Sequence, residues 1–255
     1  MSTPVALSIA GSDPSGGAGI QADLKTFHQF GVYGEAAITL ITVQNSRGVE
    51  SVKVLDAELV AAQIRAVIED IRPGAAKIGA IGNREVAEAV GRLAVDFDFP
   101  LVVDPVMISK HGIGLAEVDA ISPLLRHAFL LTPNLDEASA LCGFRVADLD
   151  SMRRACTFLV QQGTSNVMVK GGHLHGDAVD VLKSHGKMHD FYGERIDSKN
   201  THGTGCAYSA AITAELAKGT ELIEAIARAK AWITEAIRTN PGLGGGSGPL
   251  NFFAR

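Results

Sequence analysis

Residues 201–206 read Thr-His-Gly-Thr-Gly-Cys, and residues 207–212 (Ala-Tyr-Ser-Ala-Ala-Ile) continue them as an apolar run of small side chains. The pattern predicts a glycine loop that enters a buried helix. Because a helix N-terminus has unpaired N–H groups and a partial positive charge, glycines there admit an anion. Cys206 falls in the first turn, where this field should lower the pKa of its thiol. The stretch therefore indicates phosphoryl transfer; the alternative is a packed helix with an inert, buried cysteine.

The composition is that of a globular protein without a nucleic-acid or membrane surface. The chain has 255 residues, 46% hydrophobic and 20% charged, with 28 glycines and a net charge of −5. An acidic balance argues against a general basic face. The opening residues 1–4 lack a basic signal-peptide region, and no apolar run is long enough for a membrane helix. Three cysteines, Cys142, Cys156 and Cys206, lack metal-type spacing and predict reduced thiols in the cytoplasm.

Short apolar runs alternate with amphipathic segments along the whole chain. The predicted strands are 5–9, 36–43, 75–79, 101–105, 129–131 and 166–169, with an extended segment at 49–55 and a hairpin of 178–182 with 188–192. The predicted helices are 20–30, 59–71, 84–95, 118–125, 152–160, 206–218 and 222–237, and one that begins after Pro133. Strand–helix alternation without an interdomain linker predicts a single α/β domain over 1–255, with helices on both faces of a mainly parallel sheet.

Polar residues follow the predicted strands at their ends. They are Asp13, Gln44, Asp104, Asn134 and Lys170. Ligands of parallel α/β sheets bind beyond the carboxyl ends of the strands, so these residues and the loop 203–206 should converge on one site. Asp13 either contacts a substrate or caps the next turn. The amide of Gln44 either hydrogen-bonds to the edge of a heterocyclic ligand or stabilises a loop by hydrogen bonds.

Two further segments of the chain contain candidate functional residues, but neither contains a common nucleotide-binding motif. Asn134 and Glu137, three residues apart after Pro133, should lie on one face of a helix. Residues 106–114 are predicted to form a glycine-punctuated loop that contains Lys110. The chain has neither the G-x-G-x-x-G spacing nor a Walker motif, so a nucleotide would have to be bound in another way.

These residues occur in an order that resembles a known family over essentially the whole chain. The similar segments are 11–13 with 15–26, 43–45, 104–107, 132–134 with Glu137, 170–173 and, most specifically, 201–206. Together they resemble hydroxymethylpyrimidine/phosphomethylpyrimidine kinases, which are similar in fold to ribokinase and to pyridoxal kinases. The resemblance implies a three-layer α/β/α ribokinase-like sandwich and two successive ATP-dependent phosphorylations of 4-amino-5-hydroxymethyl-2-methylpyrimidine for thiamine diphosphate. It also implies Mg²⁺ and a homodimer.

The resemblance implies a role for each matching residue. The catalytic group would be Cys206 as base, Gly203 and Gly205 as an anion hole, and Lys170 beside the ATP phosphates. The substrate would be contacted by Gln44, Gly11, Asp13, Ala80, Val106 and Met107, and the nucleotide by Asn134, Thr201, Lys170, Gly203 and Gly205. Asp104 and Glu137 would organise Mg²⁺. Cys206 should matter more for the hydroxymethyl substrate than for the phosphomethyl substrate, whose phosphate is already acidic.

The residues at two positions differ from those common in the family, so a second substrate remains an alternative. Ala80 stands where relatives often have methionine after Lys-x-Gly, and Thr42 stands where an aliphatic residue is common. Both changes add room or polarity around the ring. The nearest alternative is a pyridoxine or pyridoxal kinase, although Gln44 favours an aminopyrimidine edge. A non-catalytic ligand-binding module is disfavoured, because Cys206 and Lys170 are both present.

Overall fold

The computed structural model describes residues 3–107, 118–172, 174 and 176–255, and within them the chain forms one nine-stranded sheet. The strands are β1 (Val5–Ser12), β2 (Tyr33–Asn45), β3 (Gly48–Val54), β4 (Ala75–Ile78), β5 (Leu101–Val103), β6 (Leu130–Leu131), β7 (Asn166–Val169), β8 (Ala178–Ser184) and β9 (Lys187–Gly193). Their order across the sheet is β3-β2-β1-β4-β5-β6-β7-β8-β9. The pairs from β2 to β7 are parallel, and β3, β8 and β9 each pair antiparallel with the strand before them.

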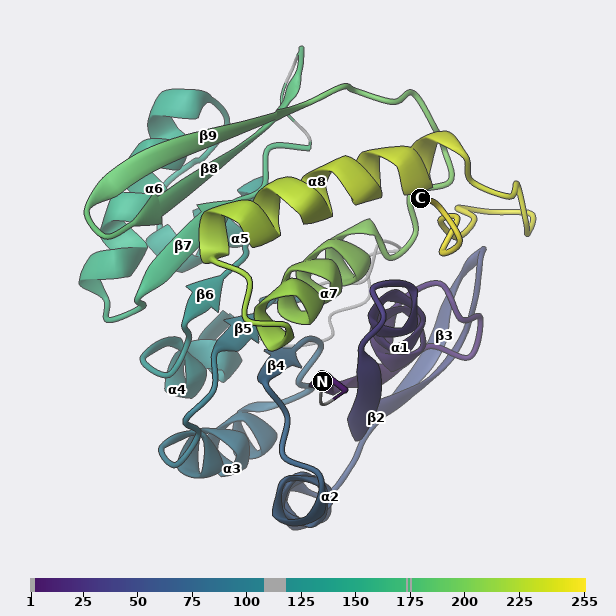
Figure 1. Ribbon diagram of the computed structural model, residues 1–255, viewed down its shortest axis with the longest axis vertical. Helices are drawn as coiled ribbons and strands as arrows, with labels where there is room; N and C mark the ends of the chain where they lie inside the picture. The colour runs from purple at the N-terminus through teal and green to yellow at the C-terminus, as the bar shows by residue number, and fades with distance from the viewer. Residues whose placement is uncertain (1–2, 108–117, 173, 175) are drawn as a thin grey trace.

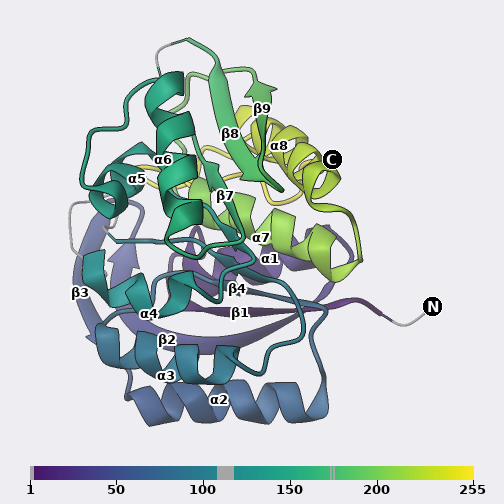
Figure 2. The ribbon, with the colours of Figure 1, turned by 90° about the vertical axis from the view of Figure 1, so that its left-hand side faces the viewer.

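Helices cover both faces of the sheet. They are α1 (Gly19–Gln29), α2 (Ala57–Asp70), α3 (Arg84–Ala94), α4 (Ser122–Leu125), α5 (Leu135–Cys142), α6 (Leu149–Gln161), α7 (Thr204–Ala217) and α8 (Leu222–Arg238). Helices α1, α7 and α8 pack on one face, and α2 to α6 pack on the other (Figures 1 and 2). The predicted three-layer α/β/α fold is therefore confirmed, as are the extended segment at 49–55 and the hairpin of 178–182 with 188–192.

Two details differ from the sequence prediction. The helix expected over 118–125 is a 3₁₀ turn, Val118–Ile121, followed by the short α4. Pro123 lies in the first turn of α4 and has no N–H to donate, which interrupts a continuous helical ladder. The strands β1 and β2 are also longer than predicted, because backbone pairing continues beyond the apolar residues, from Val5↔Tyr33 to Ser12↔Ile41. Lys110 lies outside the described residues.

Helix α7 runs through the centre of its layer. Its residues from Ala207 to Leu216 are all buried, which matches an apolar pattern without a polar face. Its entry depends on Gly203, which has φ 75° in the left-handed region. A Cβ on Gly203 would lie 1.8 Å from the carbonyl oxygen of Gly17. Glycine is therefore required there, and it lets the start of α7 sit against the N-terminal glycine loop.

Candidate active site

The first turn of α7 faces charged groups at the carboxyl ends of the central strands. A Cβ on Gly205 would lie 3.3 Å from Lys170 Nζ and 3.8 Å from Asp104 Oδ2. The turn itself is closed by Thr204, whose N–H and hydroxyl both donate to the carbonyl of Thr201, at 3.3 and 2.8 Å. The predicted anion loop, the lysine and a carboxylate thus meet at one place, as expected for a parallel sheet.

Lys170 and Asp104 form an ion pair that is almost fully buried. Nζ lies 2.6 Å from Oδ1, and the side chains are 12% and 1% exposed. Asp104 also accepts hydrogen bonds from the hydroxyl groups of Thr132, at 3.2 Å, and Ser209, at 3.1 Å. Burial alone would raise the pKa of Asp104, but Lys170 and Lys77 hold it below its ordinary value. The Asp104 carboxylate is therefore ionised and lies at the carboxyl edge of the sheet.

Asn134 and Glu137 form a capping box at the start of α5. The Glu137 N–H donates to Asn134 Oδ1 at 2.9 Å, and the Asn134 N–H donates to Glu137 Oε2 at 2.8 Å. Asn134 is therefore the N-cap that precedes the helix, and the capping box holds its side chain and that of Glu137 together at the start of α5. The Lys170 N–H donates to the carbonyl of Pro133 at 2.8 Å, which holds this cap beside Lys170. Burial raises the pKa of Glu137 to about 7, although Lys170 lowers it.

Cys206 lies in the first turn of α7 as predicted, but the expected lowering of its pKa is wrong. Burial raises the pKa of the Cys206 thiol to about 11, although the charge of Lys77 acts to lower it. Asp104 and Asp23 raise it further, and the Gly19 N–H, a hydrogen-bond donor to the sulfur, lowers it. Loss of water around the sulfur thus outweighs the field of the helix terminus. The thiol is protonated at neutral pH in the ligand-free protein.

Sequence reasoning missed a buried ion pair close to this thiol. Lys77 Nζ lies 2.9 Å from Asp23 Oδ2, both side chains are 0% exposed, and Ser8 Oγ donates to the same oxygen at 2.6 Å. Although burial alone would lower the pKa of Lys77, the Asp23 carboxylate and Cys206 raise it. A signal was present, because Lys77 interrupts the apolar residues of β4. A charge in a fully buried strand needs a partner, but the sequence does not identify it.

A second cluster, also missed in part, joins the N-terminal loop to the start of α7. Asp13 Oδ2 lies 2.8 Å from Nε2 of His202, which is itself 3.2 Å from Gln44 Nε2. Asp13 also accepts from the N–H and hydroxyl of Ser15 and from the N–H of Ala18, each at 2.9 Å. The alternative in which Asp13 caps the next turn therefore describes it better than substrate binding. Burial alone would raise the pKa of Asp13, but the hydrogen bonds from His202 and Ser15 lower it.

The remaining predicted substrate residues lie nearby with different exposure. Gly11 has no room for a side chain, because a Cβ there would lie 2.5 Å from Leu40 Cδ1. Ala80 is half-buried, and its carbonyl accepts from the Thr39 hydroxyl at 2.6 Å. Val106 is also half-buried, next to Asp104. Met107 is 5% exposed and packs in the hydrophobic core, so little of its side chain can reach a ligand.

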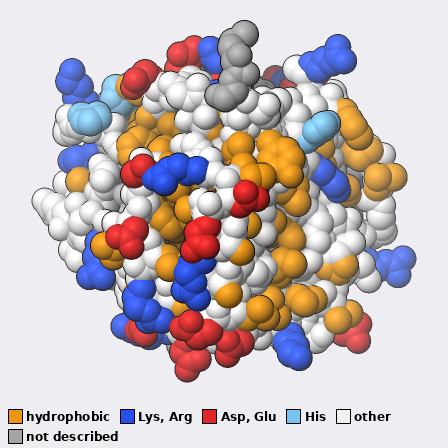
Figure 3. Space-filling model, turned by 60° about the horizontal axis from the view of Figure 1, so that its bottom comes forward, with side chains coloured by type: hydrophobic (Ala, Val, Ile, Leu, Met, Phe, Trp, Pro, Cys, Tyr) orange, Lys and Arg blue, Asp and Glu red, His pale blue; other side chains and the backbone are white. Residues whose placement is uncertain are grey.

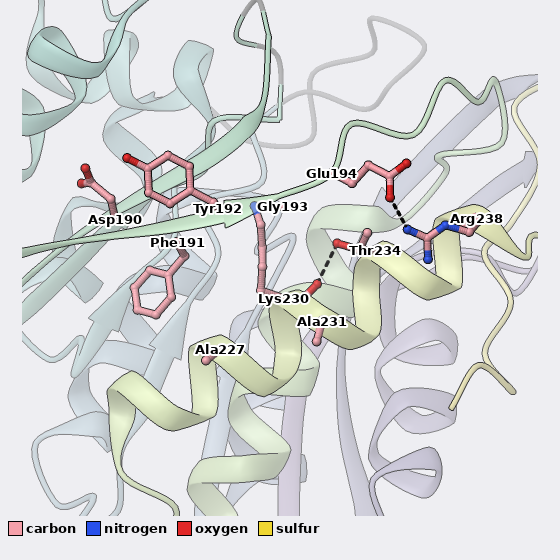
Figure 4. A pocket seen from close by; sticks show the side chains of 10 residues that line it. All are labelled: Asp190, Phe191, Tyr192, Gly193, Glu194, Ala227, Lys230, Ala231, Thr234 and Arg238. Atoms are coloured by element: carbon pink, nitrogen blue, oxygen red, sulfur yellow. Dashed lines mark hydrogen bonds and ion pairs between the residues drawn. The ribbon is translucent and has the colours of Figure 1, made fainter.

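A groove elsewhere on the molecule takes no part in this arrangement. It measures about 460 Å³ and lies between the edge strand β9 and helix α8 (Figure 4). Its lining includes Tyr192, Glu194 and Arg238, and contains none of the predicted site residues. On the face drawn in Figure 3, Lys and Arg side chains are interspersed with Asp and Glu. Among the described residues, no helix is long and apolar enough to cross a membrane, and no cluster of three or more His, Cys, Asp or Glu could hold a metal ion.

This fold and site define a class, that of ribokinase-like kinases acting on small molecules. The sequence model of the family described as phosphomethylpyrimidine kinase matches residues 13–251. The chain belongs to this family. A hydroxymethylpyrimidine/phosphomethylpyrimidine kinase of Streptomyces coelicolor is 44% identical over 252 residues, which cover 97% of this chain and 94% of that protein.

Solved structures agree with this assignment and include a second vitamin kinase. A phosphomethylpyrimidine kinase of Clostridium difficile 630 is 42% identical, with a TM-score of 0.80, over 91% of this chain and 99% of that one. An ADP complex of Bacillus subtilis pyridoxal kinase is 39% identical, with a TM-score of 0.90, over 99% and 98%. Fold similarity alone therefore does not separate the two substrates.

Proposed function

We propose that this kinase phosphorylates the hydroxymethyl group of 4-amino-5-hydroxymethyl-2-methylpyrimidine and then the resulting monophosphate, within thiamine diphosphate biosynthesis. The observation that carries the proposal is the first turn of α7, in which Gly205 faces the Lys170–Asp104 pair and Cys206 follows directly. The turn provides N–H donors for an anion, the lysine provides positive charge, and the thiolate form of Cys206 provides a proton acceptor.

ATP and Mg²⁺ fit the residues at this edge of the sheet. Mg²⁺ in kinases is commonly held by one or two carboxylates together with phosphate oxygens, and Asp104 and Glu137 offer two carboxylates beside Lys170. Asn134 and Thr201 lie at the same edge and are proposed to contact the nucleotide. When bound, ATP supplies the phosphoryl group and Mg²⁺ neutralises charge on its oxygens.

The chain's own groups divide the work of the two steps. Gly203 and Gly205 admit the transferring phosphoryl group to the N–H donors of α7, and Lys170 neutralises charge next to them. In the first step, the ionised sulfur of Cys206 accepts the proton that the hydroxymethyl oxygen loses as it bonds to phosphorus, and becomes a neutral thiol. In the second step, the attacking oxygen belongs to an ionised phosphate and has no proton to lose. Cys206 therefore serves the first step more than the second.

Gln44 is proposed to select the pyrimidine. An aminopyrimidine edge has a ring-nitrogen acceptor beside an amino donor, and a carboxamide satisfies both at once. The half-buried Gln44 lies at the end of β2, tied to His202 and thus to the start of α7. Gly11 and the half-buried Ala80 and Val106 are proposed to border the same ring. Pyridoxal presents a phenolic oxygen instead, so we expect at most a side activity on it.

The test is ATP turnover with hydroxymethylpyrimidine, its monophosphate and pyridoxal offered separately, in wild type and Gln44→Ala. We expect both pyrimidines to be better substrates than pyridoxal. Loss of the amide should weaken pyrimidine binding about tenfold to a hundredfold, because two polar groups lose their partners. A preference of the wild type for pyridoxal, or unchanged pyrimidine affinity in Gln44→Ala, would contradict the proposal.

The proposal also covers the domain organisation, the oligomeric state and the cellular location of the protein. We propose that residues 1–255 act as one kinase domain, that the protein is a homodimer, and that it works in the cytoplasm. The free thiols Cys142, Cys156 and Cys206 support a reducing compartment. Sedimentation of the purified protein at several concentrations tests the dimer.

A further inference from the structure

Gln44 sits between two side chains whose own hydrogen bonds decide which way its carboxamide points. One terminal atom of the amide lies 3.2 Å from His202 Nε2, and the other lies 3.3 Å from Thr42 Oγ1. In the structure, nitrogen faces the histidine and oxygen faces the threonine. Because the two ends of a carboxamide have nearly the same shape, the donors and acceptors of its neighbours decide which orientation is more stable.

On the histidine side, the neighbour is a donor. His202 Nε2 lies 2.8 Å from Asp13 Oδ2, and His202 is 5% exposed. The Asp13 carboxylate is an acceptor only, so Nε2 must carry a hydrogen in order to bond with it. The atom of Gln44 beside this N–H is then better placed as the oxygen, which can share the hydrogen, than as a second donor.

On the threonine side, the neighbour is an acceptor. Thr42 Oγ1 lies 3.0 Å from the carbonyl oxygen of Ser12, which can only accept. The single hydroxyl hydrogen of Thr42 is therefore directed to Ser12. Towards Gln44, the hydroxyl offers only lone pairs, so the amide atom that faces it should be the nitrogen. Both neighbours independently favour the same orientation, in which the amide is rotated by half a turn about its last carbon–carbon bond.

We propose that His202 and Thr42 are positioning residues that hold the Gln44 carboxamide with its oxygen towards the imidazole and its nitrogen towards the hydroxyl. This inference rests on the proposed function, since it assumes that Gln44 reads the pyrimidine. One N–H and one lone pair of the amide then remain for the substrate, in a fixed order along its edge. In the pyrimidine, the hydroxymethyl group is bonded next to the amino-bearing carbon. The order of donor and acceptor on Gln44 therefore also sets the direction in which the reacting group points.

In this arrangement, the hydroxyl of Thr42 helps to fix the orientation of the Gln44 amide. An aliphatic residue at this position would leave the amide nitrogen without its acceptor, so the orientation would depend on His202 alone. The hydroxyl does not add loose polarity to the pocket, because Thr42 is 6% exposed and its hydrogen is used by Ser12. Thr42 should therefore sharpen the choice of an aminopyrimidine over a ring with a different edge.

The orientation can be observed directly by NMR in the ligand-free protein. We expect nuclear Overhauser effects from the Gln44 side-chain NH₂ protons to the Thr42 methyl group, and much weaker ones to the His202 ring proton on Cε1. The reverse pattern would show that the amide nitrogen faces His202 and would overturn the proposal.

The effect on selectivity is measured by the Kd values for hydroxymethylpyrimidine and pyridoxal. Thr42→Val, which keeps the shape but removes the hydroxyl, should weaken pyrimidine binding about twofold to tenfold, the scale of one hydrogen bond. Pyridoxal binding should change less, and Thr42→Ser should restore pyrimidine binding. In a Gln44→Ala background, Thr42→Val should have no further effect. Thr157→Val is a control remote from the site, because the Thr157 hydroxyl donates to the Arg153 carbonyl within α6 and accepts from Lys183.

The binding measurements distinguish a wrong substrate site from a wrong role for Thr42. If Gln44→Ala leaves pyrimidine affinity unchanged, the proposed substrate site itself is wrong. If Gln44→Ala weakens binding but Thr42→Val does not, the site stands and the positioning role of Thr42 is refuted. Equal losses for Thr42→Val in the presence and absence of Gln44 would also refute it, because the hydroxyl would then act independently of the amide.

Discussion

Replacing Lys77 by methionine removes the only charge that faces Asp23 at hydrogen-bonding distance among the described residues. Both side chains are 0% exposed, and Asp23 would keep Ser8 as its single side-chain donor. Asp23 Oδ1 is already buried without a hydrogen-bond partner. Breaking a buried ion pair from one side leaves an uncompensated charge and costs about 3–5 kcal/mol of unfolding free energy. Because the pair has no access to water, we expect the full range rather than the small value of a surface pair.

The assay is guanidinium chloride unfolding of the ligand-free protein, followed by circular dichroism. A double variant, Lys77→Met with Asp23→Leu, should recover most of the loss, because exchanging a whole buried pair for apolar side chains is often neutral. Lys53→Met is the control, since Lys53 is exposed on β3 and its loss should change stability by less than about 0.5 kcal/mol. The reasoning is refuted if Lys77→Met costs less than about 1 kcal/mol, or if the double variant is no more stable than the single one.

Three further predictions concern other groups. Lys170→Met should raise the ATP KM or lower kcat while leaving the pyrimidine Kd nearly unchanged, and excess EDTA should abolish turnover; an unaffected enzyme in either test contradicts this. Burial, aided by Asp70, raises the pKa of Glu35 from 4.5 to about 7, so stability should fall as pH rises through that interval, and Glu35→Gln should reduce the fall in Tm. Parallel Tm curves would exclude it. Cys206→Ala should slow phosphorylation of the hydroxymethyl substrate about 10²-fold or more, and that of the phosphomethyl substrate less.

The fold could be predicted because its signals are local and repeated. Buried parallel strands are continuous apolar runs, and amphipathic helices repeat their apolar residues every three to four positions. The alternation of the two patterns therefore predicts a sheet with a layer of helices on each face. The convergence of Lys170, Asp104 and the start of α7 follows from the same topology. The prediction of one continuous helix over 118–125 was wrong because an apolar pattern carries no information about the N–H that Pro123 lacks.

The errors at the site arise from burial, which the sequence does not specify. The position of Cys206 at a helix start was read correctly, but its pKa depends on how much water reaches the sulfur. The main partner of Asp13, His202, is distant along the chain, so the sequence could not identify this contact. Lys77 was visible as a charge in an apolar strand, yet nothing local assigns Asp23 as its partner. Long-range polar pairing is thus what sequence patterns leave out.

The high pKa of Cys206 turns its proposed role into a distinctive pH dependence. With a pKa of about 11, roughly one thiol in 10⁴ is ionised at pH 7 in the ligand-free protein. If the thiolate is the base, kcat/KM for the hydroxymethyl substrate should rise about tenfold per pH unit between pH 7 and 9. The phosphomethyl substrate, whose second ionisation lies near pH 6, is already a dianion there and should give a nearly flat profile. Parallel profiles for the two substrates would mean that Cys206 does not act as a base, because only the first step has a hydroxyl proton to remove.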